Sequence, residues 1–139
     1  NLNVNRLLKF EIQSLPGAAW QDYTGSISGG DAYPRWKWAG SLAYENGPVQ
    51  LGVRWRRMTS FVDASRVTNP NSVVAAPDAV QYFDLFSRIS VGESFEFRLG
   101  VTNVGNVTPP QVGALRGFTN QALYDVVGRA YYVGARAKF

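Results

Sequence analysis

The sequence predicts an all-β protein made of about six antiparallel, up-and-down strands from the wall of a transmembrane β-barrel. Three observations predict this class. Apolar and polar residues alternate over six segments, aromatic residues make up 14% of the chain, and short connections alternate strictly with long ones. An alternation with a period of two is typical of a strand with two chemically different faces, and no segment shows helical periodicity of comparable strength.

The strands are predicted from alternate residues, all odd-numbered or all even-numbered, which point to the same face of a strand. In the fifth segment Phe95, Phe97 and Leu99 fall on one face and Glu96 and Arg98 on the other. The last segment, RAYYVGARAKF, alternates in the same way and ends on an aromatic residue. The predicted strands are residues 2–13, 35–46, 48–58, 81–91, 94–103 and 129–139.

The connections between these segments are of two kinds. ENGP (residues 45–48) and VGES (91–94) are tight turns, and Asn-Gly is the strongest short signal of a hairpin. The other three connections exceed twenty residues each and are rich in Pro, Gly, Asn and Ser, which is typical of loops. In an up-and-down sheet all tight turns then lie at one end and all long loops at the other, as in outer-membrane barrels. A soluble β-sandwich also alternates, but three such long loops are unusual in it.

The charged residues indicate which face meets lipid. An Arg or Lys on the lipid face at the bilayer midplane costs about 2–4 kcal/mol. We therefore predict that the side of each strand that carries the charged residues faces the lumen. Arg6 and Arg57 depart from this pattern. Arg57 lies close to the loop end, where its side chain can reach head groups, and the same argument is applied to Arg6, nearer the middle of its predicted strand. The predicted lumen-facing charges are Arg54, Arg56, Asp84, Arg88, Glu96, Arg98 and Arg136.

Within that set, Asp84, Arg88, Glu96 and Arg98 lie on the same face of adjacent predicted strands. We therefore expect ion pairs between neighbouring strands, as cross-strand neighbours of opposite charge usually make.

Catalysis is not expected. The chain has no His and no Cys, which removes the usual pairs of base and nucleophile, and no cofactor or metal site is predicted. The net charge of +4 is spread along the strands rather than gathered in a patch, which argues against nucleic-acid binding. Trp20, Asp22 and Tyr23 on the first long loop are candidates for ligand contact, although packing against neighbouring loops is the plainer interpretation.

Two stretches carry a resemblance to a known family. YFDLFSRISVGESFEFRLGVTNVGNVTPP (residues 82–110) followed by YDVVGRAYYVGARAKF (124–139) closely resembles the C-terminal end of TonB-dependent outer-membrane receptors. PRWKWAGSLAYENGPVQLGVRWR (34–56) is similar to the preceding hairpin of that family. The resemblance covers essentially the whole chain and is most specific over residues 82–139.

The resemblance implies a 22-stranded barrel with an N-terminal plug, located in the outer membrane of Gram-negative cells. Such receptors import scarce ligands (siderophores, haem, cobalamin or oligosaccharides) with energy passed on by TonB. This chain has no plug and no TonB box, and its strands correspond to about the last quarter of such a barrel. We therefore expect its partners to be outer-membrane lipid, the TonB system, and the remaining strands and plug of a receptor or further copies of itself.

The terminal strand carries a further expectation from the family. A terminal aromatic residue after alternating apolar ones is the signal that the barrel-assembly machinery recognises, which physically would be edge-strand pairing. We expect Phe139 to be a true, periplasmic chain end and Asn1 to be a cut end. The alternatives are a soluble β-sandwich that binds ligands and a small self-associating barrel. The residues assigned to lipid contact and assembly are Tyr131, Val133, Ala135, Ala137 and Phe139.

Overall fold

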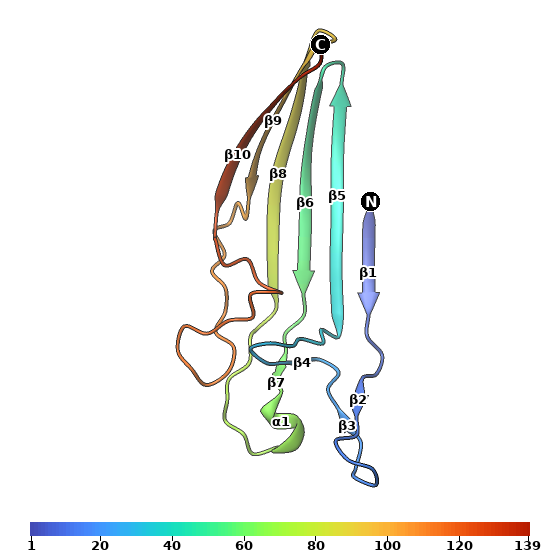
Figure 1. Ribbon diagram of the computed structural model, residues 1–139, viewed down its shortest axis with the longest axis vertical. Helices are drawn as coiled ribbons and strands as arrows, with labels where there is room; N and C mark the ends of the chain where they lie inside the picture. Colours follow the sequence, from blue (N-terminus) through green and yellow to red (C-terminus); the bar gives the residue numbers. More distant parts are fainter.

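A computed structural model describes residues 1–139 and has one long, curved antiparallel sheet with a smaller assembly of loops at one end (Figure 1). The prediction of an all-β chain with six antiparallel strands is confirmed, and the sheet is open rather than closed into a barrel. The strands follow the order β1-β5-β6-β8-β9-β10, so β1 and β10 form the two edges. Their bounds are β1 Leu2–Arg6, β5 Trp36–Asn46, β6 Val49–Met58, β8 Val80–Val91, β9 Phe95–Thr102 and β10 Ala130–Ala137.

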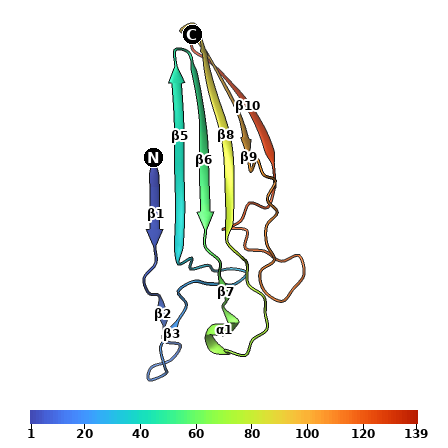
Figure 2. The ribbon, with the colours of Figure 1, turned by 180° about the vertical axis from the view of Figure 1, so that it is seen from behind.

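The two tight turns and the long loops lie at opposite ends of the sheet, as predicted (Figures 1 and 2). Gly47 and Gly92 occupy the turns with φ of 56° and 61°, a region that favours glycine because it lacks a β-carbon. The C-terminus lies at the tight-turn end beside these two hairpins. The last five strands begin and end within two residues of the predicted ranges.

The first predicted strand, residues 2–13, is too long. Pairing with β5 stops at Arg6 and Trp36, because Pro34 ends the partner strand and the chain turns away after the amide of Leu7 donates to the carbonyl of Arg35 at 3.0 Å. Leu8, Phe10 and Ile12 therefore do not continue the apolar face of the sheet. Phe10 instead stacks on Tyr33 of the first loop, with ring centroids 4.2 Å apart.

The long connections contain short elements of their own. The chain between β1 and β5 holds an antiparallel pair of two-residue strands. The first and second loops meet in a short pair of parallel strands, which is followed by a single helical turn. No helix in the structure is long and apolar enough to span a membrane. These elements are β2 Glu11–Ile12, β3 Gln21–Asp22, β4 Ser26–Ile27, β7 Val62–Asp63 and α1 Ser65–Thr68.

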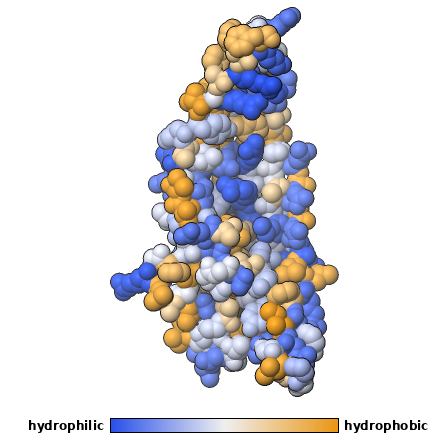
Figure 3. Space-filling view, in the orientation of Figure 1, coloured by the Kyte–Doolittle hydropathy of each residue, from blue (hydrophilic) through white to orange (hydrophobic).

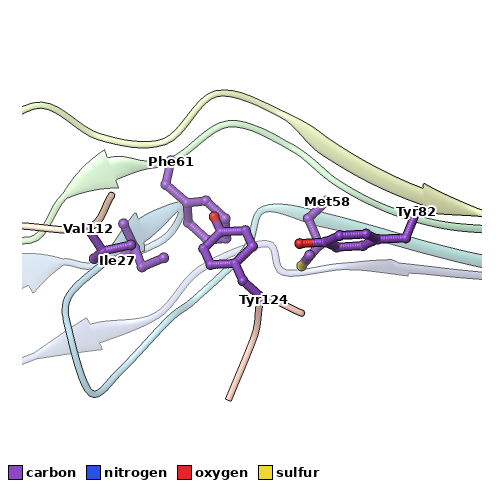
Figure 4. Packing of buried hydrophobic residues seen from close by; sticks show 6 residues of the cluster. All are labelled: Ile27, Met58, Phe61, Tyr82, Val112 and Tyr124. Atoms are coloured by element: carbon purple, nitrogen blue, oxygen red, sulfur yellow. The ribbon is translucent and has the colours of Figure 1, made fainter. Parts of the chain in front are cut away.

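The loops pack around a hydrophobic cluster of their own, which the sequence did not predict. In Figure 4, Ile27 and Val112 lie together at one side of the cluster, next to Phe61 and Tyr124. These four residues come from three different loops. The cluster then continues to the ends of β6 and β8 through Met58 and Tyr82. Burial of these side chains fixes the loops onto the end of the sheet.

Candidate functional site: the two faces of the sheet

The register places most of the large apolar side chains of the strands on one face of the sheet, here called the apolar face, while Phe86 and Tyr132 lie on the other. One row runs directly across five strands as Leu42, Val53, Leu85, Val101 and Tyr131. Because every strand keeps this parity, a one-residue slip of any strand would move its apolar set to the other side. The strand alternation read from the sequence therefore becomes one continuous surface.

This apolar face is open to the surroundings. Leu42 is 72% exposed and Val133 77%, although both lie in the middle of their strands. Around the small side chain of Ser87 the face is hollowed by about 490 Å³, with a lining that is almost wholly apolar. Monomeric soluble proteins rarely expose an apolar patch of such continuity. Other exposed large residues on it are Leu2, Val4, Tyr44, Leu51, Phe83, Leu85, Val91, Phe95, Phe97, Leu99 and Tyr131.

Aromatic residues lie near both ends of the apolar face. At the loop end the rings of Trp36 and Trp38 stack with centroids 5.7 Å apart. At the turn end lie Tyr44 and Phe95. Tyr82, an aromatic residue at the loop end of β8, does not belong to this set: it lies on the opposite face, pairs with Arg56 in register and is buried beneath the last loop. Tyr82 is two residues from Asp84 on the same strand, so the sequence alone already placed the two side chains on the same face.

The opposite face, here called the polar face, has a charged centre at the loop end. The guanidinium of Arg56 lies 3.4 Å from Asp84 and 4.0 Å from Asp125 of the last loop. It also sits over the ring of Tyr82, whose hydroxyl accepts a hydrogen bond from the amide of Asp125. Asp125 was not anticipated, because nothing in the loop sequence indicates that it returns to the sheet.

Figure 3 shows hydrophilic residues over the middle of the sheet in this view and hydrophobic ones along its margins.

Asp84 also fixes the start of the last loop. Its carboxylate accepts a hydrogen bond of 2.9 Å from the buried amide of Asn103. Asn103 adopts a φ of 50°, a left-handed conformation that Asn tolerates better than most residues. Its side chain then exchanges two 2.8 Å hydrogen bonds with the backbone of Val107. Asp84 is therefore a structural anchor as well as a partner of Arg56.

The remaining predicted lumen charges lie on this polar face, but with partners other than those expected. Arg88 reaches Glu45 at 3.8 Å, and Arg98 pairs with Glu96 of its own strand at 2.6 Å. Arg88 and Arg98 are direct register partners of like charge, so the expected ladder between β8 and β9 does not form. The guanidinium of Arg54 lies 4.9 Å from the centroid of Phe86, and no carboxylate lies within ion-pair distance of Arg54 or Arg136.

A pocket of about 440 Å³ lies between the loop end of the polar face and the last loop. Arg56 and Tyr82 line it, and Lys37 contributes a cation that has no ion-pair partner. Amide groups and alkyl side chains complete the wall, so the pocket offers both hydrogen bonding and apolar contact. Its other lining residues are Asn3, Asn5, Trp38, Ala39, Arg57, Met58, Ala122 and Leu123.

The candidate ligand contacts on the first loop lie apart from this pocket. Trp20 is 62% exposed, and Tyr23 packs edge-on against Tyr33 with centroids 6.5 Å apart. Asp22 accepts a hydrogen bond of 2.8 Å from the amide of Thr24, and the hydrogen bonds from Thr24 lower the pKa of Asp22. Packing and turn formation account for Tyr23 and Asp22, and a ligand role for the three residues remains a prediction.

The terminal strand forms one edge of the sheet. Tyr131, Val133, Ala135 and Ala137 lie on its apolar face, paired with β9. The outer edge of the strand has no neighbour. Phe139 lies just beyond the strand and is fully exposed, after the amide of Lys138 donates to the carbonyl of Ser94.

No group of three or more His, Cys, Asp or Glu side chains is placed to hold a metal ion. Comparison with protein-family models, curated proteins and solved structures gives no match to this chain.

Proposed function

We propose that the chain forms the C-terminal part of the wall of an outer-membrane β-barrel of the TonB-dependent receptor class, with its apolar face on lipid and its polar face toward the lumen. The barrel of such a receptor imports a scarce ligand, and this chain supplies wall, loops and terminal edge. The observation that carries the proposal is the exposed apolar face, which keeps one parity across all six strands.

The dimensions of the strands support this placement. β5, β6 and β8 have 11, 10 and 12 residues, close to the 9–11 that a tilted membrane strand needs. At about 3.4 Å per residue and a tilt of about 40°, an 11-residue strand rises about 28 Å, against an apolar band of about 25 Å. Aromatic residues at both ends of the face suit the two interfaces of a bilayer.

The unpaired edges support a larger assembly. Both β1 and β10 lack an outer neighbour, and lipid does not tolerate unpaired backbone groups. Six strands are fewer than the eight or so of the smallest common membrane barrels. Closure therefore needs further strands, which a receptor provides in the same chain. The same two edges favour, as a second candidate, a small barrel that closes by pairing copies of this chain.

The polar pocket is the part of this wall best suited to meet a transported ligand. It lies at the loop end of the polar face, where Lys37 presents a cation without an ion-pair partner and Arg56 a guanidinium shared with Asp84 and Asp125. Anionic or hydroxylated groups fit this lining. Lumen substitutions are known to tune selectivity in barrels, so the pocket would contribute to ligand choice together with the rest of the receptor.

The absence of cysteine allows a direct test with single-cysteine variants. Leu42→Cys and Ala43→Cys are consecutive, exposed positions in the middle of β5 on opposite faces. Each would be labelled with a fluorophore in the chain refolded into lipid vesicles. The proposal predicts that a lipid-soluble quencher reaches the label at position 42 and that an aqueous quencher reaches the label at position 43.

Equal quenching of both labels by the aqueous reagent would overturn the lipid assignment and favour the soluble sandwich. A chain that stays monodisperse without detergent would do the same. Mass measurement in detergent separates the two membrane candidates, because closure by copies predicts a defined multimer.

A further inference from the structure

The loop end of the apolar face carries two arginines, and the polar side chain of Gln81 is the register partner of one of them, Arg57. Arg6 ends β1 and Arg57 lies one residue before the end of β6. The sequence placed Arg6 near the middle of a longer strand, but the strand ends there, so both cations lie at the same level of the sheet. Both side chains are exposed, and neither has an ion pair or a hydrogen bond from its side chain within the chain.

The two arginines flank the tryptophan pair. The guanidinium of Arg6 lies 4.9 Å from the centroid of Trp36, whose ring stacks on Trp38, and Trp38 is the register partner of Arg57. Two strand spacings of about 4.8 Å and an offset of two residues place the α-carbons of Arg6 and Arg57 about 12 Å apart. The order across the surface is therefore cation, two stacked rings, cation.

This arrangement matches the boundary between acyl chains and head groups. Tryptophan rings prefer that depth, where one part is apolar and the other is wet. Arginine binds phosphate through paired N–H donors, and a guanidinium stacked on an indole is held in place before the ligand arrives. Two unneutralised cations at that depth complement an anionic head group and not a neutral one.

We propose that Arg6, Trp36, Trp38 and Arg57 form a binding site for the phosphorylated head group of a membrane lipid at the loop end of the barrel wall. The inference rests on the proposed function, because it takes the apolar face to meet lipid. It adds a ligand class and four residues whose register positions place them on the apolar face, although Trp38 and Arg57 also line the polar pocket. It also gives the two arginines that break the apolar pattern a role.

The test uses the full chain in detergent micelles and lipid A as the probe, with the same lipid after removal of its phosphates as the comparison. Lipid retention is measured by native mass spectrometry for the parent chain and for Arg6→Gln, Arg57→Gln and the double variant. Arg54→Gln is the matched control, since Arg54 is equally exposed, also lacks an ion pair and also lies 4.9 Å from an aromatic ring, but on the polar face.

We expect the parent chain to retain the phosphorylated lipid in preference to the dephosphorylated one. Each single variant should weaken this binding about fivefold and the double variant about 25-fold, while Arg54→Gln changes it by less than about twofold. Circular dichroism verifies that the variants keep the β-sheet, and inorganic phosphate should fail to displace the lipid.

Equal retention of both lipids, or retention that the double variant leaves unchanged, would overturn the head-group site while leaving the lipid-facing assignment intact. Displacement by inorganic phosphate would show a simple anion site instead. Failure of the proposed function has a different signature: a chain that is monodisperse without detergent and retains neither lipid.

Discussion

The ring of Phe86 on β8 lies directly over the α-carbon of its register partner Gly52 on β6, in space that any β-carbon would occupy. The guanidinium of Arg54, on the same face of β6, lies over that ring. Tyr132 of β10 covers Gly100 of β9 in the same way. Each pair replaces a missing side chain with an aromatic ring from the next strand, which holds the register and the curvature of the sheet.

Gly52→Ala should therefore destabilise the sheet by about 1–3 kcal/mol, because the added methyl group forces Phe86 out of its position. Urea unfolding of the chain in detergent measures the change. Gly134→Ala is the control, since a β-carbon there meets its nearest atom at 3.9 Å, an ordinary contact. If both substitutions have the same effect, the fit between Phe86 and Gly52 is not what matters.

Asp84→Ala should cost about 1–3 kcal/mol, because it leaves the buried amide of Asn103 without an acceptor. The loss should appear as faster hydrogen exchange at residues 103–107, where the last loop starts, as well as a lower unfolding midpoint. Glu45→Ala removes the exposed partner of Arg88 and should change stability by less than about 1 kcal/mol. Comparable losses for the two variants would contradict an anchoring role for Asp84.

Ile27→Ala should loosen the loops without unfolding the sheet. Ile27 is 1% exposed within the loop cluster, and truncation of such a side chain costs about 2–5 kcal/mol. Limited proteolysis should cleave the loops of the variant much faster, while the strands stay protected in detergent. Val73→Ala, at a loop position 92% exposed, should behave like the parent chain. Loss of the whole sheet would show that loops and sheet unfold as one unit.

Acid should weaken the turn after β3. Hydrogen bonds from Thr24 hold the pKa of Asp22 below its ordinary value, so this contribution to stability is complete above the ordinary pKa of an aspartate. It is lost as the pH falls through the lower pKa of the folded state. The protection factor of the Thr24 amide should fall in that range, and Asp22→Asn should remove the pH dependence. A protection factor that declines equally in the variant would point to another group.

The predictions from sequence were best where one physical rule acts along the whole segment. Alternation located the last five strands, because each carries an apolar side and a polar side over eight or more residues. The same rule failed after Arg6: Leu8, Phe10 and Ile12 keep the alternation, but the partner strand starts only at Trp36. Strand length is set by the partner as well as by the segment.

The candidate site was predictable only in part for a related reason. Parity placed Arg56 and Asp84 on the same side, and the register brings them together. Asp125 and the loop cluster depend on contacts between segments far apart in the chain, and loops have no periodicity from which such contacts can be read. Asn103 did have a signal, since Asn followed by a Gly-rich loop favours a left-handed residue at the end of a strand.

The final prediction separates a face on lipid from a face on water. Leu42 and Ala43 are consecutive residues in the middle of β5, both exposed and on opposite faces. In water an arginine at either position is solvated, and the two variants should differ little. In a bilayer Leu42→Arg should cost about 2–4 kcal/mol, because its charge enters the apolar layer, whereas Ala43→Arg points toward the lumen. Denaturant unfolding from lipid vesicles and from detergent-free buffer measures the difference. An equal cost for the two arginines in vesicles would show that the apolar face does not meet lipid.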